Sequence, residues 1–141
     1  MSEGPFDAAL RERHIAESMQ RMPGPTYYDV LGWIHETVRP ANYLEIGVRH
    51  GFSLGNVLEE TRTVAVDPNP LVTYPFPNLE IYGVTSDEFF AREDVDEILR
   101  GPIELAFIDG LHLFEQVVRD FINVERHSDR DTIALFHDPV P

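Results

Sequence analysis

The stretch YLEIGVRHGFSL, residues 43–54, decides the fold, because an apolar run is interrupted there by two glycines four residues apart and then resumes. The residues NYLEIGV, 42–48, have the composition of a buried strand. Apolar residues then recur at helical spacing, which predicts a helix over 51–60. Glycines between a strand and a helix let the backbone turn tightly and approach a ligand, and the start of the helix would add free N–H groups.

Glu45 stands inside this apolar run, where an ionised carboxylate is costly unless another group pairs with it. Two kinds of partner would serve, a cationic group on a ligand or an organised set of hydrogen-bond donors in the protein. The residue is therefore either part of a binding site or a structural carboxylate.

The remainder of the chain alternates between predicted strands and predicted helices. Strands are predicted at 63–67, 79–84, 103–109 and 132–138, and helices at 86–99 and 112–126. The proline-rich stretch 68–78 cannot hold a regular helix and is predicted as a loop. Such alternation predicts an α/β fold, in which a Rossmann-like, doubly wound parallel sheet of strand order 3-2-1-4-5 is covered by helices on both faces.

Two helices are predicted before the sheet, at 6–22 and 26–38, separated by the helix breaker MPGP at 22–25. We therefore predict an N-terminal helical segment over 1–39 and a sheet domain over 40–141. A chain of 141 residues suffices for one domain with its own core.

The composition excludes several classes of function. The chain has 25 acidic and 11 basic residues, a net charge of −14, and every basic residue is arginine. A surface of that sign repels phosphate backbones, so we expect no nucleic-acid binding. The absence of cysteine excludes disulfides and cysteine-based zinc sites. No apolar stretch reaches the length of a membrane span and the N-terminus lacks a basic signal region, so we expect a cytoplasmic protein with no membrane partner.

Glycines and polar residues gather where the predicted strands end. They are Gly47, Gly51, Asp67, Asp109, His137 and Asp138. The carboxyl ends of parallel strands meet at one edge of a sheet, and doubly wound sheets bind their ligands there. We therefore expect these residues to form one site.

The glycine spacing indicates the class of ligand. A dinucleotide fingerprint reads G-x-G-x-x-G, whereas this turn reads G-x-x-x-G with Arg49 in place of the middle glycine. That difference argues against a pyrophosphate pressed onto the turn and favours a bulkier, less anionic ligand. Asp67 follows Gly47 by twenty residues, and a carboxylate there can accept hydrogen bonds from a ribose diol. A nucleoside with a cationic amino-acid tail, such as S-adenosylmethionine, fits both observations.

The same residues resemble a known family. LEIGVRHGFSL (44–54) resembles motif I of class I S-adenosylmethionine-dependent methyltransferases, E-x-G-x-x-x-G-x-S, and VAVDPNP (64–70) resembles their motif II. YGVTSDEF (82–89) resembles their third-strand region beside the adenine. AFIDGLHLFEQVVRDF (106–121) is similar to the D-G-x-H-x-[YF] signature of a small-molecule O-methyltransferase branch, methyltransferase family 24, and IALFHDP (133–139) to the end of its fifth strand.

The resemblance covers residues 40–139 and implies a methyltransferase that uses S-adenosylmethionine. Its implied acceptor is a hydroxyl of a small molecule, such as an antibiotic, a sugar or another natural product. The implied cofactor residues are Glu45, Gly47, Gly51 and Ser53 for the methionine part, Asp67 for the ribose, and Thr85, Ser86 and Asp87 for the adenine, with Asp109 also in the cofactor site.

The resemblance also implies catalytic and metal-binding residues. His112, with Asp109 beside it, is implied as the general base on the acceptor hydroxyl, since an unperturbed histidine titrates near neutral pH. Some relatives bind a divalent metal through the acids that end the fourth and fifth strands, which here are Asp109 and Asp138. Coordination by oxygen alone would favour Mg²⁺, whereas His137 or His112 would favour a transition metal.

Each of these residues also has a purely structural interpretation. Gly47 and Gly51 would serve any tight turn, and Asp67 would cap the turn that follows it. Asp109 would serve as the N-cap of the next helix, with His112 at the exposed start of that helix. The final histidine–aspartate pair would be an ordinary polar strand end.

The resemblance implies two further strands after the fifth, which this sequence does not contain, so we expect the fifth strand to be an exposed edge. Three explanations are open: a truncated chain, a naturally short protein whose edge is covered by a partner or a second copy, and a remnant that binds cofactor without catalysis. The alternatives to a methyltransferase are a non-catalytic nucleoside-binding or assembly module and a nicotinamide-dependent oxidoreductase. The glycine spacing counts against the last of these.

Overall fold

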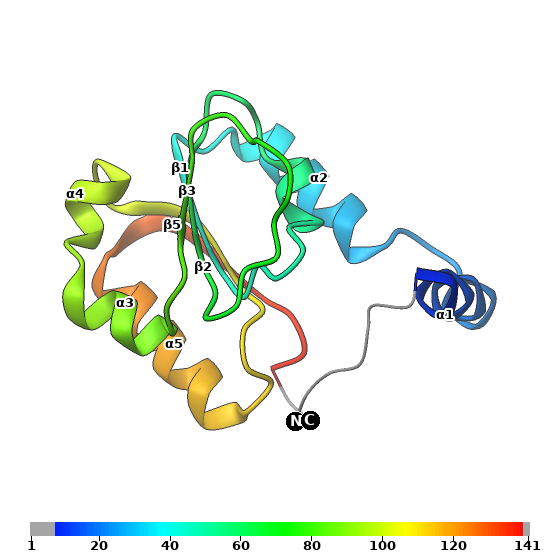
Figure 1. Cartoon of the computed structure of the whole chain (residues 1–141). Helices are drawn as coiled ribbons and strands as arrows, with labels where there is room; N and C mark the ends of the chain where they lie inside the picture. The colour runs from blue at the N-terminus through cyan, green and yellow to red at the C-terminus, as the bar shows by residue number, and fades with distance from the viewer. Residues whose placement is uncertain (1–7, 140–141) are drawn as a thin grey trace.

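The computed structural model describes residues 8–139, which form a five-stranded sheet between layers of helices (Figure 1). The strands are β1 (Asn42–Ile46), β2 (Arg62–Val66), β3 (Leu79–Tyr82), β4 (Ile103–Ile108) and β5 (Ser128–Phe136). Every neighbouring pair is parallel, and the order across the sheet is β3-β2-β1-β4-β5. The doubly wound sheet and its strand order are therefore confirmed. The strands predicted at 63–67, 79–84 and 103–109 form, with ends that differ slightly.

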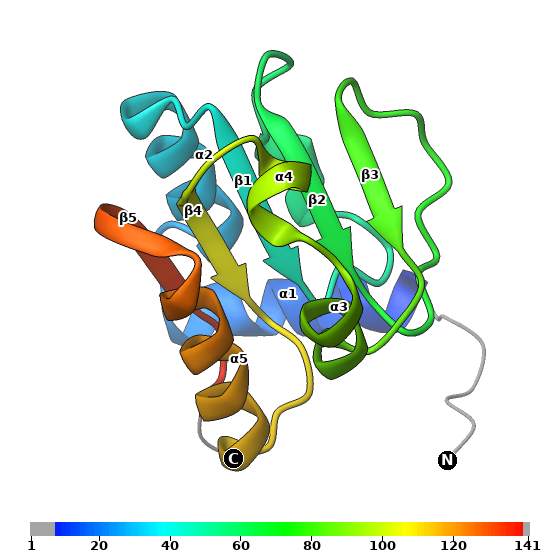
Figure 2. The ribbon, with the colours of Figure 1, turned by 90° about the vertical axis from the view of Figure 1, so that its left-hand side faces the viewer.

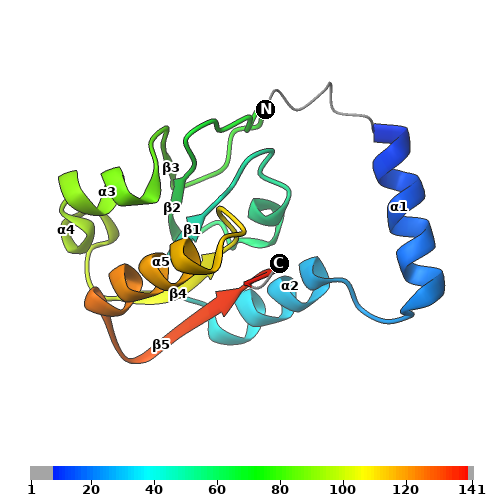
Figure 3. The ribbon, with the colours of Figure 1, turned by 90° about the horizontal axis from the view of Figure 1, so that it is seen from below.

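Helices cover both faces of this sheet. They are α1 (Ala8–Arg21), α2 (Tyr27–Val38), the 3-10 helix η1 (Ser53–Asn56), α3 (Ser86–Arg92), α4 (Val95–Leu99) and α5 (Phe114–Arg126). α2 packs on one face, and α3, α4 and α5 pack on the other (Figure 2, Figure 3). Because all strands run the same way, the loops that follow them meet at one edge.

α1 stands apart from the sheet (Figure 3), and none of its residues is buried. The guanidinium carbon of Arg11 lies 4.4 Å from the centre of the Phe52 ring, in the loop after β1. The helix predicted at 6–22 agrees with α1 over its described part, whereas residues 6 and 7 lie outside the described residues. The helix predicted at 26–38 forms as α2.

Alternating strand residues divide the core into two clusters, one on each face. Leu44 and Ile46 of β1 belong to the cluster beneath α3, α4 and α5. Tyr43 belongs to the cluster beneath α2, together with Leu31 of that helix. All five β1 residues are buried, as expected for a central parallel strand covered on both sides. The strand predicted at 42–48 is thus confirmed as a buried one, although it ends at Ile46.

His35 of α2 is buried in the second cluster, with its ring edge-on to Tyr43 at a centre distance of 4.6 Å. Neither ring nitrogen has a hydrogen-bond partner within residues 8–139. Burial lowers the pKa of His35 to about 4, because the charged form would lose its hydration. The side chain therefore packs as a neutral ring at neutral pH.

The helix predicted over 51–60 is wrong, because only one turn of it forms. η1 ends at Asn56, and Val57 returns to extended backbone with a ψ of 138°. That single turn already buries Leu54, which is 1% exposed. Gly55 lies inside the segment and disfavours a longer helix. The glycine turn after β1 therefore does not lead into an α-helix. The free N–H groups expected from the start of such a helix are consequently not provided there.

The helix predicted at 86–99 is two helices in the structure. Asp94 interrupts it by accepting a hydrogen bond from the Glu97 N–H at 3.1 Å, which starts α4. An aspartate that can cap the backbone locally competes with a continuous helix. The prediction therefore had the right span and missed one break.

The helix predicted at 112–126 begins at Phe114. Its N-cap is Leu113, which makes no side-chain capping bond, so the interpretation of Asp109 as the N-cap is wrong. The backbone N–H of Asp109 instead donates to a β1 carbonyl, which keeps this part of the chain in the turn after β4. His112 consequently lies in the loop between β4 and α5 and not on the helix.

β5 begins at Ser128, four residues earlier than the strand predicted at 132–138, and ends at Phe136. Its polar first half can form a strand because β5 lies at the edge of the sheet, where its side chains remain largely exposed. His137 and Asp138 therefore follow the strand instead of ending it.

Candidate functional site

A cavity of about 730 Å³ opens at the edge of the sheet where the strands end, within the size range of small-molecule sites. Its walls come from the loops after β1, β2, β3 and β4 and from the first turn of α2. The predicted residues that line it are Gly47, Ser53, Asp67, Thr85, Ser86, Asp87, Asp109 and His112. The predicted residues that do not line it are Glu45, Gly51, His137 and Asp138.

Gly47 lies where the turn after β1 crosses the turn after β4. Its φ is +87°, in the left-handed region that side chains disfavour. A Cβ at this position would lie 2.1 Å from the carbonyl oxygen of Asp109. Backbone bonds of 2.8 Å fix the crossing, from Gly47 N–H to Val66 O and from Asp109 N–H to Ile46 O. Gly47 is therefore a turn residue, and the turn that it makes lines the cavity.

Asp67 ties the loop after β1 to the loop after β2. Its Oδ2 accepts the Arg49 N–H and its Oδ1 accepts the Asn69 N–H, both at 2.8 Å. The side chain lines the cavity and the residue is 9% exposed. A carboxylate has about four acceptor positions, so two backbone bonds leave capacity for the hydroxyls of a ligand. Asp67 thus caps the turn, as its structural interpretation requires, and can still accept hydrogen bonds from a diol.

Glu45 is fully buried behind the cavity wall. It accepts hydrogen bonds from the Tyr43 hydroxyl, at 2.8 Å, and from the Ser53 hydroxyl. Burial raises the pKa of Glu45 to about 7, and the two hydroxyl donors oppose that rise. Of the two partners considered for this carboxylate, the structure provides an organised set of donors within the protein. Ser53 stands between Glu45 and the cavity.

The buried carboxyl of Glu45 predicts a pH dependence of stability. Its folded pKa is about 7 and its unfolded value about 4.5, so the folded state retains an extra proton between them and the free energy of unfolding falls as pH rises through 7. From pH 6.5 to 8.5 we expect a fall of about 1 kcal/mol in urea unfolding experiments, and no such fall in Glu45→Gln. An equal fall in that variant would assign the effect to another group.

His35 changes the stability of the fold with pH in the opposite direction to Glu45, and it does so at lower pH. Its folded pKa of about 4 lies below its unfolded value of 6.5, so the stability that it contributes is present above pH 6.5 and is lost as pH falls toward 4. The two effects oppose each other between pH 4.5 and 6.5. Because Glu45→Gln retains His35, the difference between the wild type and this variant isolates the contribution of Glu45.

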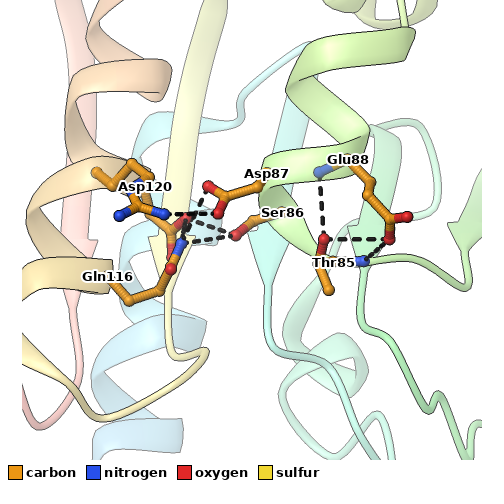
Figure 4. Close-up of polar contacts among 7 residues, drawn as sticks. Thr85, Ser86, Asp87, Glu88, Gln116 and Asp120 are labelled. Carbon is orange, nitrogen blue, oxygen red and sulfur yellow. Dashed lines mark hydrogen bonds and ion pairs between the residues drawn. The ribbon is translucent and has the colours of Figure 1, made fainter.

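A polar network joins α3 to α5 at the cavity wall (Figure 4). Asp120 is 1% exposed and accepts hydrogen bonds from Ser86 Oγ at 2.6 Å and from Gln116 Nε2 at 3.0 Å. The same amide donates to Asp87 Oδ1 at 3.3 Å, and Arg119 pairs with the other Asp87 oxygen at 2.8 Å. Burial raises the pKa of Asp120. Of the three residues predicted to lie beside an adenine, Ser86 and Asp87 are thus held in place from α5, whereas Thr85 caps its own helix through Glu88.

Gln116 and Asp120 line the cavity but were not predicted as site residues. They lie one turn apart on α5, and Asp120 shares the buried face of that helix with Val117 and Val124. A carboxylate among the buried positions of an amphipathic helix is a signal that could have identified it. Its partner Ser86 is 34 residues away, so the pairing itself is not visible in the sequence.

Asp109 and two histidines lie together beyond the ends of β4 and β5. His137 Nδ1 is 3.1 Å from Asp109 Oδ1 and 3.4 Å from Asp138 Oδ2. The ring centres of His112 and His137 are 6.4 Å apart. Burial raises the pKa of Asp109, and the positive charge of His137 and His112 opposes that rise. Of these two histidines, His112 is the one that lines the cavity.

The residues predicted to bind a metal do not converge on one position. Within residues 8–139, no three histidine, aspartate or glutamate side chains are placed to hold an ion together. Asp109 and Asp138 both lie against Nδ1 of His137 instead. In this arrangement the two carboxylates share a histidine.

The first turn of α2 adds an aromatic wall that the motifs did not indicate. Thr26 and Asp29 form a reciprocal capping box that fixes the start of this helix. The Tyr27 ring centre lies 4.0 Å from that of Tyr28 and 4.4 Å from that of His137. Burial, followed by the neighbouring Tyr28, raises the pKa of Tyr27. Both tyrosines line the cavity, and Tyr27 lies on the side of His137 and its partner Asp109.

Residues 44–139 match a protein family described as a methyltransferase domain. The chain belongs to this methyltransferase family. The resemblance read from its motifs is confirmed by that match. The fold of this chain is similar to that of an O-methyltransferase from Bacillus cereus in complex with SAH, at 17% identity and a TM-score of 0.62, over 94% of this chain and 66% of the other.

A second similar structure is TomG from Streptomyces achromogenes, an O-methyltransferase involved in tomaymycin synthesis, in complex with SAM. It is 14% identical, with a TM-score of 0.61, over 93% of this chain and 65% of the other. At such identities the similarity establishes the fold of this chain and nothing further. The chain spans 66% and 65% of the lengths of these two proteins.

A comparison with curated proteins found no match. Within residues 8–139, no helix combines the length and the apolar character needed to span a bilayer.

Proposed function

We propose that this methyltransferase transfers the methyl group of S-adenosylmethionine to a hydroxyl of a small molecule. One observation carries the proposal: Asp67, suited to a ribose diol, and His112, suited to proton transfer, line the same cavity. The family match supports the reaction type, and two O-methyltransferases with SAH or SAM bound have a similar fold.

The cavity residues fit the parts of S-adenosylmethionine. Asp67 would accept the ribose hydroxyls, and the first turn of α3, held from α5, would lie beside the adenine. The methionine part would lie against Gly47 and Ser53. Glu45 is a positioning residue in this proposal, because it holds the Ser53 hydroxyl from behind and does not itself line the cavity.

When bound, S-adenosylmethionine supplies an electrophilic methyl group on its sulfur. The residues of the protein hold the acceptor oxygen in line with that methyl group, which accounts for much of the rate in such transfers. His112 takes the hydroxyl proton from the acceptor oxygen onto a ring nitrogen. Asp109 lines the same part of the cavity and stabilises the resulting imidazolium by its charge. Tyr27 and Tyr28 form the wall beside the acceptor.

His112→Gln is expected to lower the rate of methyl transfer about 100-fold and to leave affinity for S-adenosylhomocysteine within about twofold, since a general base contributes to the reaction step and not to cofactor binding. The rate is measured as S-adenosylhomocysteine released from S-adenosylmethionine with a panel of phenols, catechols and sugars, and the affinity by calorimetry. His127→Gln is the matched control, because His127 lies at the far end of α5 against Asp96. An unchanged rate in His112→Gln would remove its assignment as base.

A non-catalytic nucleoside-binding or assembly module is the alternative function, and it would use the same Asp67 site without proton transfer. S-adenosylhomocysteine binding with no turnover on any acceptor of the panel would favour it. The nicotinamide-dependent alternative finds no support in the family match.

A divalent metal at Asp109 and Asp138, with His137, stays a prediction, since both carboxylates would have to turn toward a shared ion. A cofactor-binding unit at 40–141 and a cytoplasmic location also stay predictions.

A further inference from the structure

Asp120 of α5 is the most deeply buried carboxylate among the described residues that line the cavity, at 1% exposed. Its Oδ1 atom accepts hydrogen bonds from Ser86 Oγ at 2.6 Å and from Gln116 Nε2 at 3.0 Å. In the described part of the chain, no group donates to its other oxygen, Oδ2. The sealed side-chain atoms without a partner there belong to His35 and His137, so Oδ2 reaches the cavity. A ligand that donates to this oxygen would remove the cost of leaving it without a donor.

Gly110, in the loop after β4, leaves space beside this oxygen. Its φ is not positive, so the backbone conformation does not require glycine. A Cβ at Gly110 would lie 3.7 Å from Asp120 Oδ2 and 3.3 Å from Ile46 Cγ2. Any side chain at this position would therefore occupy the space next to Oδ2. Because Gly110 also lines the cavity, that space is available to a ligand.

The side-chain atoms around Asp120 leave hydrogen-bond acceptors facing the ligand. Figure 4 shows the side chains of α3 and α5 pointing toward one another here. Ser86 gives its hydroxyl proton to Asp120, and its Oγ accepts from Gln116 Nε2 at 3.3 Å. The same amide donates to Asp87 Oδ1 at 3.3 Å, so its two hydrogens are used within the network. This corner of the cavity therefore complements a ligand group that carries N–H donors.

Asp87 is the other carboxylate at this corner, and both of its oxygens already have partners in the protein. Its Oδ1 accepts from Gln116, and its Oδ2 pairs with Arg119 at 2.8 Å. The Asp87 side chain is 43% exposed, so water competes with a ligand for it. A hydrogen bond to the buried oxygen of Asp120 forms away from water, where it is stronger. The geometry therefore favours Asp120 over Asp87 as the group that recognises a ligand.

The identity of the donor group follows from the proposed function, on which this inference rests. The ribose is assigned to Asp67 and the methionine part to the turn after β1, whereas Ser86, the partner of Asp120, lies in the wall assigned to the adenine. The 6-amino group is the part of an adenine ring that carries N–H donors. We propose that Asp120 is a specificity-determining residue, which accepts a hydrogen bond from the 6-amino group of the adenine through Oδ2.

Calorimetry with two ligands tests this assignment. One is S-adenosylhomocysteine, and the other is its 6-deamino analogue, in which hydrogen replaces the amino group. The wild type is expected to bind the intact ligand about 30-fold more tightly, because the analogue leaves a buried charged acceptor without a donor. Asp120→Asn keeps an oxygen for Ser86 and Gln116 and replaces Oδ2 by an amide NH₂ group. Its preference for the intact ligand is therefore expected to fall to about threefold or less.

Two further variants locate the effect. Asp87→Asn is the matched control, since it removes a carboxylate from the same corner, and a preference of at least about tenfold is expected to remain. Gly110→Ala leaves Asp120 intact and covers Oδ2 with a methyl group, so the preference is expected to fall about tenfold from that of the wild type. Circular dichroism verifies that each variant folds. If Asp120→Asn does not fold, Gly110→Ala decides the question.

Three results would overturn the role of Asp120 and leave the cofactor site in place. They are equal binding of the two ligands by the wild type, a full preference in both Asp120→Asn and Gly110→Ala, and a preference that is lost in Asp87→Asn alone. A folded wild type that does not bind S-adenosylhomocysteine would instead contradict the proposed function, and the inference about Asp120 would fail with it. Because only binding is measured, these outcomes do not depend on knowing the methyl acceptor.

Discussion

Gly47→Ala is expected to lower the free energy of unfolding by about 4 kcal/mol, because overpacking and backbone strain act together at this position. The added Cβ would lie 2.1 Å and 2.5 Å from the carbonyl oxygen and carbon of Asp109 and 2.6 Å from the Cα of Gly110. Those atoms are backbone, held by the β1–β4 crossing, and cannot rotate aside as a flexible side chain would. Urea unfolding followed by circular dichroism measures the loss.

Two other glycines provide controls for the separate parts of this effect. Gly101 has a φ of +143° and open space around its Cα, so Gly101→Ala reports the cost of the backbone conformation without a clash. Gly55 has open space and no positive φ, so Gly55→Ala is expected to change stability by less than about 1 kcal/mol. If Gly47→Ala loses no more free energy of unfolding than Gly101→Ala, the backbone at the β1–β4 crossing shifts to accommodate the added methyl group. The argument for a rigid cavity wall would then fail.

Asp67→Ala is expected to weaken S-adenosylhomocysteine binding about 100-fold, as the loss of charge-assisted hydrogen bonds to a ribose diol predicts. The same substitution leaves the N–H groups of Arg49 and Asn69 without their carboxylate acceptor, so some loss of stability is expected as well. Calorimetry gives the affinity, and thermal unfolding of the free protein gives the structural part.

A deoxygenated ligand separates the two roles of Asp67. S-adenosylhomocysteine without its ribose 2′- and 3′-hydroxyls cannot donate to this carboxylate, so its affinity should be nearly the same in the wild type and in Asp67→Ala. Intact S-adenosylhomocysteine should bind more tightly than the deoxygenated ligand to the wild type, and about as tightly as that ligand to Asp67→Ala. If both ligands lose affinity equally, the effect of Asp67 passes through the two loops, and the carboxylate makes no contact with the ribose.

The sequence was a good guide to the fold and to the edge that carries the site. Its strand pattern predicted the sheet order. Its polar strand ends predicted correctly that the loops after β1, β2 and β4 line the cavity, whereas the prediction for the polar residues after β5 was wrong. The errors fall where a local pattern admits two outcomes. Apolar spacing over 51–60 is satisfied by a single 3-10 turn that buries Leu54, and Asp94 caps a new helix where a continuous one was predicted. In both cases a short-range contact replaced the longer helix.

What the sequence by itself determined about this protein is the α/β class, the glycine turn after the first strand and the family, because these depend on residue types at short, regular spacing. Only the tertiary structure decided how the charged side chains are paired. Glu45 proved to be bound by hydroxyls behind the cavity and Asp120 by Ser86 across two helices, while Gly47 meets Asp109 only because two turns cross. Those partners are distant in the chain, and packing of the sheet against its helices brings them together.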